Sequence, residues 1–161
     1  MKFNIKTTCI MFVAILSMLF ISHIIIIMLE GEKGHLKRTV YKAKRLAERE
    51  NIVGLTNYIS IDYSDELGND RHTFLLIAKN FFDEYKNILI LIDALDIKIQ
   101  EEKASCHIKA TVYWQENSSK DIMSDIAEVE ANFKKEGNNW RLIGLEFFQP
   151  EKKNLFHPMI G

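Results

Sequence analysis

The stretch Ala104-Ser-Cys-His-Ile-Lys-Ala-Thr-Val-Tyr-Trp114 decides the fold class, because small or apolar residues alternate with more polar ones along all of it. A period of two places every second side chain on one face of a strand, so this pattern predicts a half-buried antiparallel β-strand. The same alternation recurs over residues 127–133. The turn sequence Glu136-Gly-Asn-Asn139 then predicts a hairpin leading into a last strand over Trp140 to Phe148.

The residues ahead of this strand predict the first strand of the same sheet. Isoleucines two residues apart occupy positions 88–92, and the pattern resumes at Ile97 after Asp93-Ala-Leu-Asp96. The segment Glu101-Glu-Lys103 predicts a turn. We therefore expect a first strand that is interrupted at Asp93–Asp96.

Three helix-forming segments precede the sheet. Apolar side chains recur at three- and four-residue steps over residues 33–50, and residues 52–59 fit a shorter helix. A third helix is predicted over residues 71–85, with Asp70 or Asn69 as its N-cap. Its apolar stripe is expected to belong to the core and consists of Phe74, Leu75, Ala78, Phe81, Phe82 and Tyr85. Helices followed by strands predict an α+β domain in which helices pack on one face of a curved antiparallel sheet.

The N-terminal region predicts a membrane anchor. Residues 9–29 include 21 positions without a charged side chain. At about 1.5 Å per residue they would cover about 31 Å, which matches the hydrocarbon core of a bilayer. A cleaved signal peptide is the alternative, but no small-residue pattern of the A-x-A type ends the segment. The sequence is thus divided into a tail over residues 1–8, a transmembrane helix over 9–29, a domain over 30–148 and a C-terminal tail over 149–161.

Two signals for the orientation of this anchor conflict. Lys2 and Lys6 precede the span, whereas six basic residues follow it between Lys33 and Arg45, so the positive-inside rule would keep the domain in the cytoplasm. The short N-terminal tail is typical of an exported signal-anchor, and the six basic residues lie in a predicted helix of the folded domain. We expect a single-pass membrane protein, in contact with the lipid bilayer through residues 9–29, whose domain is extracytoplasmic, either periplasmic or extracellular.

Composition argues against several classes of partner and cofactor. Beyond residue 29 the chain carries 19 basic and 22 acidic residues, a formal net charge of −3, so no nucleic acid partner is expected. Cys9 and Cys106 belong to different parts of the chain, which makes an intrachain disulfide unexpected. No CxxC or HExxH motif occurs, and neither a metal nor a cofactor is predicted. A homodimer or a protein partner bound through the sheet stays open.

The chain resembles the nuclear transport factor 2-like superfamily, which has a cystatin-like cone fold, from about Lys33 to Phe148. The resemblance rests on element order and on the hairpin Phe133-Lys-Lys-Glu-Gly-Asn-Asn-Trp-Arg-Leu-Ile143, which is similar to a K-x-G-x-x-W-R/K-L pattern common there. The run Tyr63-Ser-Asp-Glu-Leu-Gly-Asn-Asp-Arg71 is similar to one in bacterial members of unknown function. The superfamily includes isomerases, dehydratases, polyketide cyclases, transport factors and scaffolds, so the resemblance implies a fold and leaves the function open.

The segment Asp62–His72 holds the densest set of chemistry-bearing side chains. Tyr63 and Asp65 would face a ligand if this loop rings the mouth of the cone. The candidate ligand- or partner-binding residues are Tyr63, Asp65, Asp70 and Arg71. The alternative is a structural loop in which Tyr63 packs, Asp65 pairs with Arg71, Gly68 takes a positive φ and Asp70 caps the following helix.

Catalysis is not expected from the residues that should face the cone. An enzyme resembling ketosteroid isomerase would need an inward carboxylate together with a tyrosine or a second acid. The inward strand positions carry aliphatic and aromatic groups, with Cys106 as the one reactive side chain, so no catalytic residue is assigned. Polar residues that alternate onto the other face are His107, Tyr113, Glu128 and Glu130.

We therefore expect a membrane-anchored, non-catalytic interaction or ligand-binding module. The alternatives are a small lyase- or isomerase-like enzyme acting on an apolar small molecule, and a scaffold subunit of a secretion-type membrane assembly.

Overall fold

The computed structural model describes Ser17 and residues 31–148. The predicted tails over residues 1–8 and 149–161 lie outside the described residues, as does the predicted transmembrane helix over residues 9–29 apart from Ser17. Within the described part of the chain, no helix combines the length and the apolar composition that a bilayer crossing requires.

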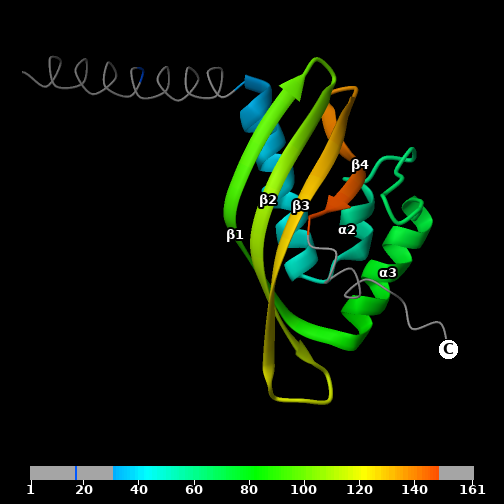
Figure 1. The fold of residues 1–161 in the computed structure, drawn as a ribbon, viewed down its shortest axis with the longest axis vertical. Coiled ribbons are helices and arrows are strands. Elements are labelled where there is room, and N and C mark those ends of the chain that lie inside the picture. The colour runs from blue at the N-terminus through cyan, green and yellow to red at the C-terminus, as the bar shows by residue number, and fades with distance from the viewer. Residues whose placement is uncertain (1–16, 18–30, 149–161) are drawn as a thin grey trace, which may run out of the picture.

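The domain is built on one four-stranded antiparallel sheet with strand order β1-β2-β3-β4 (Figure 1). The strands are β1 (Tyr85–Gln100), β2 (Lys103–Glu116), β3 (Ile122–Glu136) and β4 (Asn139–Phe147). Each strand pairs with the next along the chain, so every connection within the sheet is a hairpin. The long β2 and β3 strands follow the alternation that predicted them, and the turn over residues 136–139 joins β3 to β4 as expected.

The first strand differs from its prediction. Residues 85–100 form one strand without a break at Asp93–Asp96. The register against β2 instead shifts between Ile92 and Ala94, where a β-bulge accommodates one extra residue. A bulge bends the strand and increases its twist while pairing continues on either side. The interruption in the apolar pattern therefore marks a bend in the sheet.

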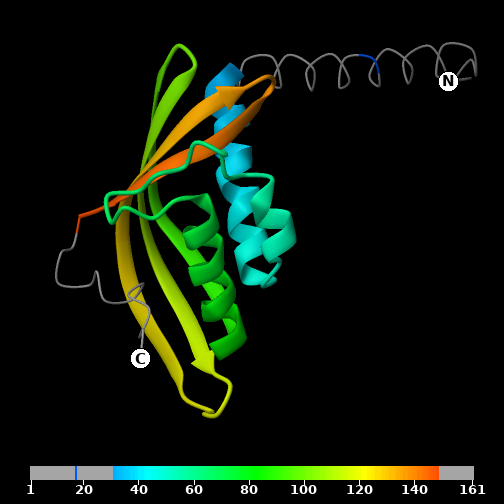
Figure 2. The same ribbon diagram turned by 90° about the vertical axis from the view of Figure 1, so that its right-hand side faces the viewer.

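The helices lie together on one face of the curved sheet (Figure 2). Residues 31–48 are helical, and α2 (Ile52–Thr56) and α3 (Arg71–Glu84) follow. The second helix is shorter than predicted, because residues 57–59 form a turn and then a bridge to Leu142 on β4. Asp70 caps α3 as expected, accepting a hydrogen bond from the Thr73 amide at 2.8 Å.

The close-packed core joins the helix over residues 31–48 to the strands. Its buried members are Leu36, Val40, Ile97, Ala104, Cys106, Ala131, Phe133 and Trp140. At the edge of this core the Glu32 carboxylate accepts hydrogen bonds from Trp140 Nε1 at 3.0 Å and Lys135 Nζ at 2.5 Å. These bonds fix the start of the described helix to the β3–β4 hairpin.

The expectation that the α3 stripe belongs to the core is wrong in part. No residue of α3 is fully buried. Phe74, Ala78, Phe81 and Phe82 do face the sheet, but they line a cavity that separates α3 from the strands. The periodicity correctly identified the inward face of the helix, and the distance between helix and sheet leaves that face only half covered.

Candidate functional site

The Asp62–His72 loop and the residues just before it lie along the free edge of β4. The amides of Ser60, Ser64 and Glu66 donate to backbone carbonyls of β4, and the Leu142 amide donates to the Tyr58 carbonyl. Gly144 on β4 is required by this approach, because a Cβ there would lie 2.7 Å from the Ser64 carbonyl oxygen. The loop therefore covers the edge of β4, which would otherwise present unpaired backbone groups.

Asp65 organises the loop from within. Its carboxylate accepts hydrogen bonds from the amides of Leu67 and Asn69 at 3.0 and 2.9 Å, and from the Asn69 side-chain nitrogen at 3.0 Å. The same carboxylate accepts a bond from the Tyr63 hydroxyl at 3.2 Å. Gly68 takes the expected positive φ of 82°. Asp65 thus makes the local side-chain contacts typical of a structured turn.

Tyr63 is buried beneath the loop, with 3% of its surface exposed. Its ring packs against Phe74 of α3 with the centroids 4.9 Å apart. Burial raises the pKa of the Tyr63 hydroxyl, and the nearby negative charge of Asp65 raises it further. Tyr63 is therefore a neutral hydrogen-bond donor to Asp65. This arrangement agrees with the alternative in which Tyr63 packs within a structural loop, and not with the one in which it faces a ligand.

Arg71 does not pair with Asp65, so that expectation is wrong. A terminal guanidinium nitrogen of Arg71 donates to the Thr56 carbonyl at 3.0 Å, which ties the start of α3 to the end of α2. Asp65 is already occupied by loop amides and by Tyr63. The structure thus places Tyr63 and Asp65 in contact with each other, while Asp70 and Arg71 serve the start of α3.

A second candidate site is the cavity inside the cone. It has a volume of about 360 Å³ and lies between the inner face of the sheet and the three helices. Its surface is formed almost entirely by carbon atoms. Its walls include Phe74, Ala78, Phe81, Ile90, Ala110 and Val112. No aspartate or glutamate is among the lining residues.

Two ionisable residues of this wall were missed by sequence reasoning. Lys44 and Tyr58 both line the cavity. The Lys44 ammonium is bound to the Glu48 carboxylate at 2.7 Å, and that carboxylate also accepts from the Ile90 amide at 2.9 Å. Lys44 and Glu48 are four residues apart on a helix, a spacing that favours such an ion pair and could have identified it.

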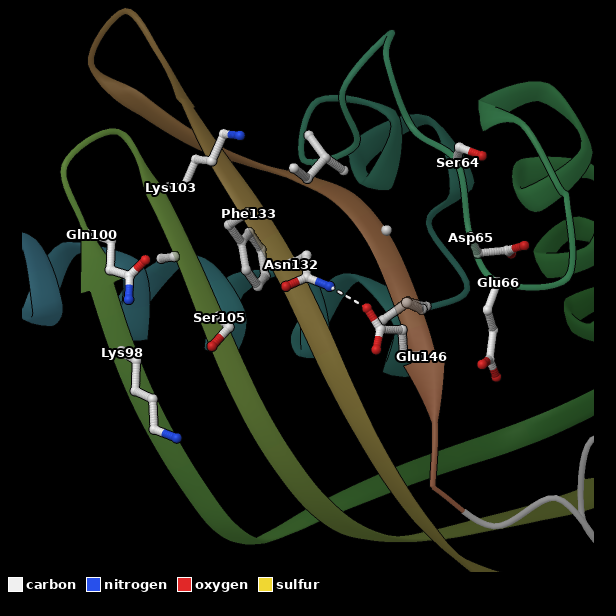
Figure 3. Close-up of a pocket in the computed structure, with 14 residues that line it drawn as sticks. Ser64, Asp65, Glu66, Lys98, Gln100, Lys103, Ser105, Asn132, Phe133 and Glu146 are labelled. Carbon is white, nitrogen blue, oxygen red and sulfur yellow. Dashed lines mark hydrogen bonds between the residues drawn. The ribbon is translucent and has the colours of Figure 1, made fainter.

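The outer face of the sheet carries the polar residues that the alternation assigned to it. His107 Nε2 lies 3.1 Å from the Glu128 carboxylate and His107 Nδ1 lies 3.5 Å from that of Glu130. Nearer the hairpin ends the outer face holds an open groove of about 680 Å³ (Figure 3). Lysines Lys98 and Lys103 line one side, and the carboxylates of Glu66 and Glu146 line the other.

Comparisons with known proteins support the fold and leave the activity open. No protein-family model matches the sequence, and no curated protein matches it either. The structure is similar to a candidate dehydratase of the NTF2-like family from Streptomyces avermitilis, with a TM-score of 0.64 and 9% identity over 73% of this chain and 95% of that one.

It is also similar to a protein of unknown function with a cystatin-like fold from Nostoc punctiforme, with a TM-score of 0.56 and 11% identity over 72% of this chain and 89% of that one. Bd1075 of Bdellovibrio bacteriovorus matches with a TM-score of 0.58 and 15% identity over 70% of this chain, which spans only 39% of Bd1075. The described domain therefore has the NTF2-like, cystatin-like α+β fold.

Proposed function

We propose that the domain is a non-catalytic module that binds a small apolar ligand in the cone cavity. The observation that carries this proposal is the chemistry of the wall, whose exposed surface is nearly all carbon. A volume of about 360 Å³ falls within the usual range for small-molecule sites, about 300–1,000 Å³. An apolar wall favours a ligand that gains by leaving water and offers little to a charged one.

The same wall argues against acid–base chemistry in the cavity. Such chemistry divides its roles between groups whose environments push their pKa values apart, commonly a pair of carboxyl groups. No carboxylate lines the cavity, and the Lys44 ammonium is held by Glu48. Glu48 in turn bonds the Ile90 amide, so this pair has a structural role between the helix and β1.

The test is binding of the neutral fluorescent probe N-phenyl-1-naphthylamine to the purified full-length chain. Ala78→Phe projects a ring into the cavity from α3, and Lys79→Phe adds the same ring at the next position, which is exposed. We expect affinity to fall at least about tenfold in the first variant and to be unchanged in the second. Equal affinity in both, with wild-type melting temperatures, would overturn the proposal.

The enzyme alternative has one specific argument in its favour, the likeness to an NTF2-like candidate dehydratase together with Lys44 and Tyr58 at the wall. Extraction of the co-purifying ligand from wild type and from Lys44→Met, followed by mass spectrometry, distinguishes the two functions. A binding module yields the same molecule from both. Different molecules, related as substrate and product, would indicate a lyase or isomerase.

The membrane anchor over residues 9–29 and the extracytoplasmic placement of the domain belong to the same proposal. The uncharged run of 21 residues supports the anchor. The six basic residues between Lys33 and Arg45 belong to a helix of the folded domain, so they do not by themselves keep the domain in the cytoplasm. Ser118 lies exposed in the β2–β3 loop, so Ser118→Cys is accessible to reagents. We expect an impermeant maleimide to label this variant in intact cells. Labelling only after lysis would place the domain in the cytoplasm.

A further inference from the structure

The solvent-exposed side of the helix over residues 31–48 carries a row of basic side chains. Arg38, Lys42, Arg45 and Arg49 are all exposed and follow one another at intervals of four, three and four residues. At 3.6 residues per turn, this spacing places them on one face of the helix. Arg49 lies just beyond the last helical residue, but its amide still donates to the Arg45 carbonyl at 3.2 Å, so it continues the row. We call these four residues the basic stripe.

The two carboxylates of this helix are engaged in contacts with the sheet and with a lysine of the same helix. Glu32 accepts a hydrogen bond from Trp140 Nε1 of β4 at 3.0 Å. Glu48 accepts from the Lys44 ammonium at 2.7 Å and from the Ile90 amide of β1 at 2.9 Å. Neither carboxylate therefore neutralises the basic stripe.

Two further exposed lysines, Lys33 and Lys37, lie in the first two turns of the same helix. Within the described residues, neither of them forms an ion pair, and neither does Lys42 or Arg49. These two lysines and the basic stripe make the helix the basic part of an otherwise acidic chain, because the sequence beyond residue 29 has 13 basic and 22 acidic residues without them. Cations gathered along one face of a helix suit a flat anionic surface.

The start of the helix adjoins the predicted span, which ends at Leu29. Gly31 has a φ of +50°, whereas a right-handed helix requires about −60°, so the backbone bends at the start of the described helix. This bend allows the helix to lie along the surface of a bilayer. If the helix instead stood upright, Lys42 would be about 20 Å from the bilayer at about 1.5 Å per residue. That distance exceeds the Debye length of about 10 Å at 0.1 M salt, so only a helix that lies flat brings the whole stripe into the field of the headgroups.

We propose that the basic stripe binds the anionic headgroups of the leaflet that faces the domain, so that the helix over residues 31–48 lies flat on the bilayer. The proposal rests on the membrane anchor over residues 9–29 and is independent of the cavity. The anchor keeps the stripe beside the bilayer, and each basic residue near an anionic surface adds to the attraction. The contact requires anionic lipid in that leaflet and is the same for either orientation of the anchor.

Nucleic acid is the other extended anionic surface that suits a row of cations. The acidic excess of the rest of the chain opposes its approach from solution. A bilayer needs no such approach, because the stripe begins 9 residues after the predicted span and ends 20 residues after it. Proximity and charge together therefore favour lipid as the partner.

Quenching of a fluorophore on the stripe by lipid tests the contact in the full-length chain. Lys42→Cys, in a Cys9→Ser background, leaves one reactive thiol, because Cys106 is buried. The bimane-labelled chain is reconstituted in vesicles of phosphatidylcholine alone or mixed with phosphatidylglycerol, with nitroxides on some headgroups that quench only near contact. We expect quenching to be at least about twofold stronger in the anionic vesicles and to fall to the neutral level in about 1 M salt, where the Debye length is about 3 Å. Equal quenching in both kinds of vesicle would overturn the proposal.

Removal of charge from the labelled chain tests whether the stripe itself makes the contact. Arg45→Gln combined with Arg49→Gln removes two cations at the end of the stripe that is distant from the span. Lys98→Gln combined with Lys103→Gln is the matched control, because it removes the same charge at exposed positions of β1 and β2. We expect quenching in the anionic vesicles to fall by at least about half in the first pair alone, with both pairs melting as the wild type does. An equal loss in the two pairs would mean that net charge attracts the domain, and it would contradict a role for the stripe.

Flotation separates this proposal from the anchor on which it rests. A chain that inserts through residues 9–29 floats with phosphatidylcholine vesicles, and a chain that stays in solution would contradict the anchor. The stripe is then judged by flotation with the anionic vesicles, where binding that salt reverses would support it and absence of binding would overturn it. A DNA duplex should not bind the protein in neutral vesicles. Duplex binding that Arg45→Gln with Arg49→Gln abolishes would assign the stripe to nucleic acid instead.

Discussion

The two faces of the β-sheet are made by alternate residues of the same strands and have opposite characters. On the inner face, Ala110 and Val112 form part of an apolar wall around the cavity. On the outer face, the intervening Thr111 bonds to Asp93, with carboxylates and exposed aliphatic groups around it. The difference shows that the effect of a substitution in this sheet depends first on the parity of its position, because neighbouring residues contact unrelated surroundings.

The largest effect is expected where the inner face is close packed. Trp140→Ala removes a side chain that is 1% exposed and leaves the Glu32 carboxylate without its indole donor. We expect the free energy of unfolding to fall by about 3–5 kcal/mol, the range for a buried aromatic residue. Urea titration measures it. Asn139→Ala, at the adjacent exposed position, should change it by less than about 0.5 kcal/mol.

A smaller loss is expected where the inner face borders the cavity. Phe81 contacts Tyr85 and Trp114 with ring centroids 4.7 and 6.3 Å apart, but it also faces open volume. Phe81→Ala should cost about 2 kcal/mol, below the range of about 3–5 kcal/mol for fully buried aromatic residues. Chemical denaturation provides the measurement. A cost as large as that of Trp140→Ala would mean that the cavity is closed in solution.

The Asp62–His72 loop borders both faces of the sheet, and the effects of two substitutions in it on stability are expected to add. Asp65 bonds loop amides, whereas Arg71 bonds the Thr56 carbonyl, so the two side chains share no contact. Asp65→Asn and Arg71→Gln should each lower stability by about 1–2 kcal/mol through lost hydrogen bonds of charged groups. Their effects should add within about 0.5 kcal/mol in the double variant.

A double-mutant cycle followed by thermal melting measures this additivity. A coupling energy above about 1 kcal/mol would show that the two residues interact after all. Variants that keep wild-type melting and abundance yet abolish the cellular phenotype of the chain would instead make the loop a functional site.

The smallest effect is confined to alkaline pH. Cys106 faces inward and is fully buried, and burial raises the pKa of its thiol from 9.0 to about 12, with the charges of Glu130 and Asp96 adding to the shift. A raised pKa in the folded state keeps the proton bound to the thiol. The contribution of Cys106 to stability is therefore fully present below pH 9 and is lost as the pH rises from about 9 towards 12.

Cys106→Ser should remove this component of the pH dependence, as measured by urea titration from pH 8 to 11. At pH 7.5 the thiol of Cys106 should react with a maleimide only after unfolding, in a chain that carries Cys9→Ser. Reaction in the folded state at that pH would place Cys106 on an accessible surface.

Local patterns predicted the elements better than the contacts between them. The alternation in β2 correctly assigned Cys106 inward and His107 outward, and Asp70 was correctly chosen as a cap. The contact predicted for Arg71 was wrong, because its actual contact with Thr56 spans 15 residues and depends on how α2 meets α3. The sequence predicts an interruption after Ile92 where the structure has a bulge, because a bulge and a break disturb an apolar pattern in the same way.

By itself, the sequence determined the α+β class, the order of the elements and the face of each strand that turns inward, because these follow from local periodicity and turn chemistry. Only the tertiary structure decided that α3 stands away from the sheet and leaves a cavity, and that the Asp62–His72 loop lies along β4. It also decided that Leu91, Thr111 and Ile126 form one surface. These features depend on distances between elements and on register across strands, which no local pattern specifies.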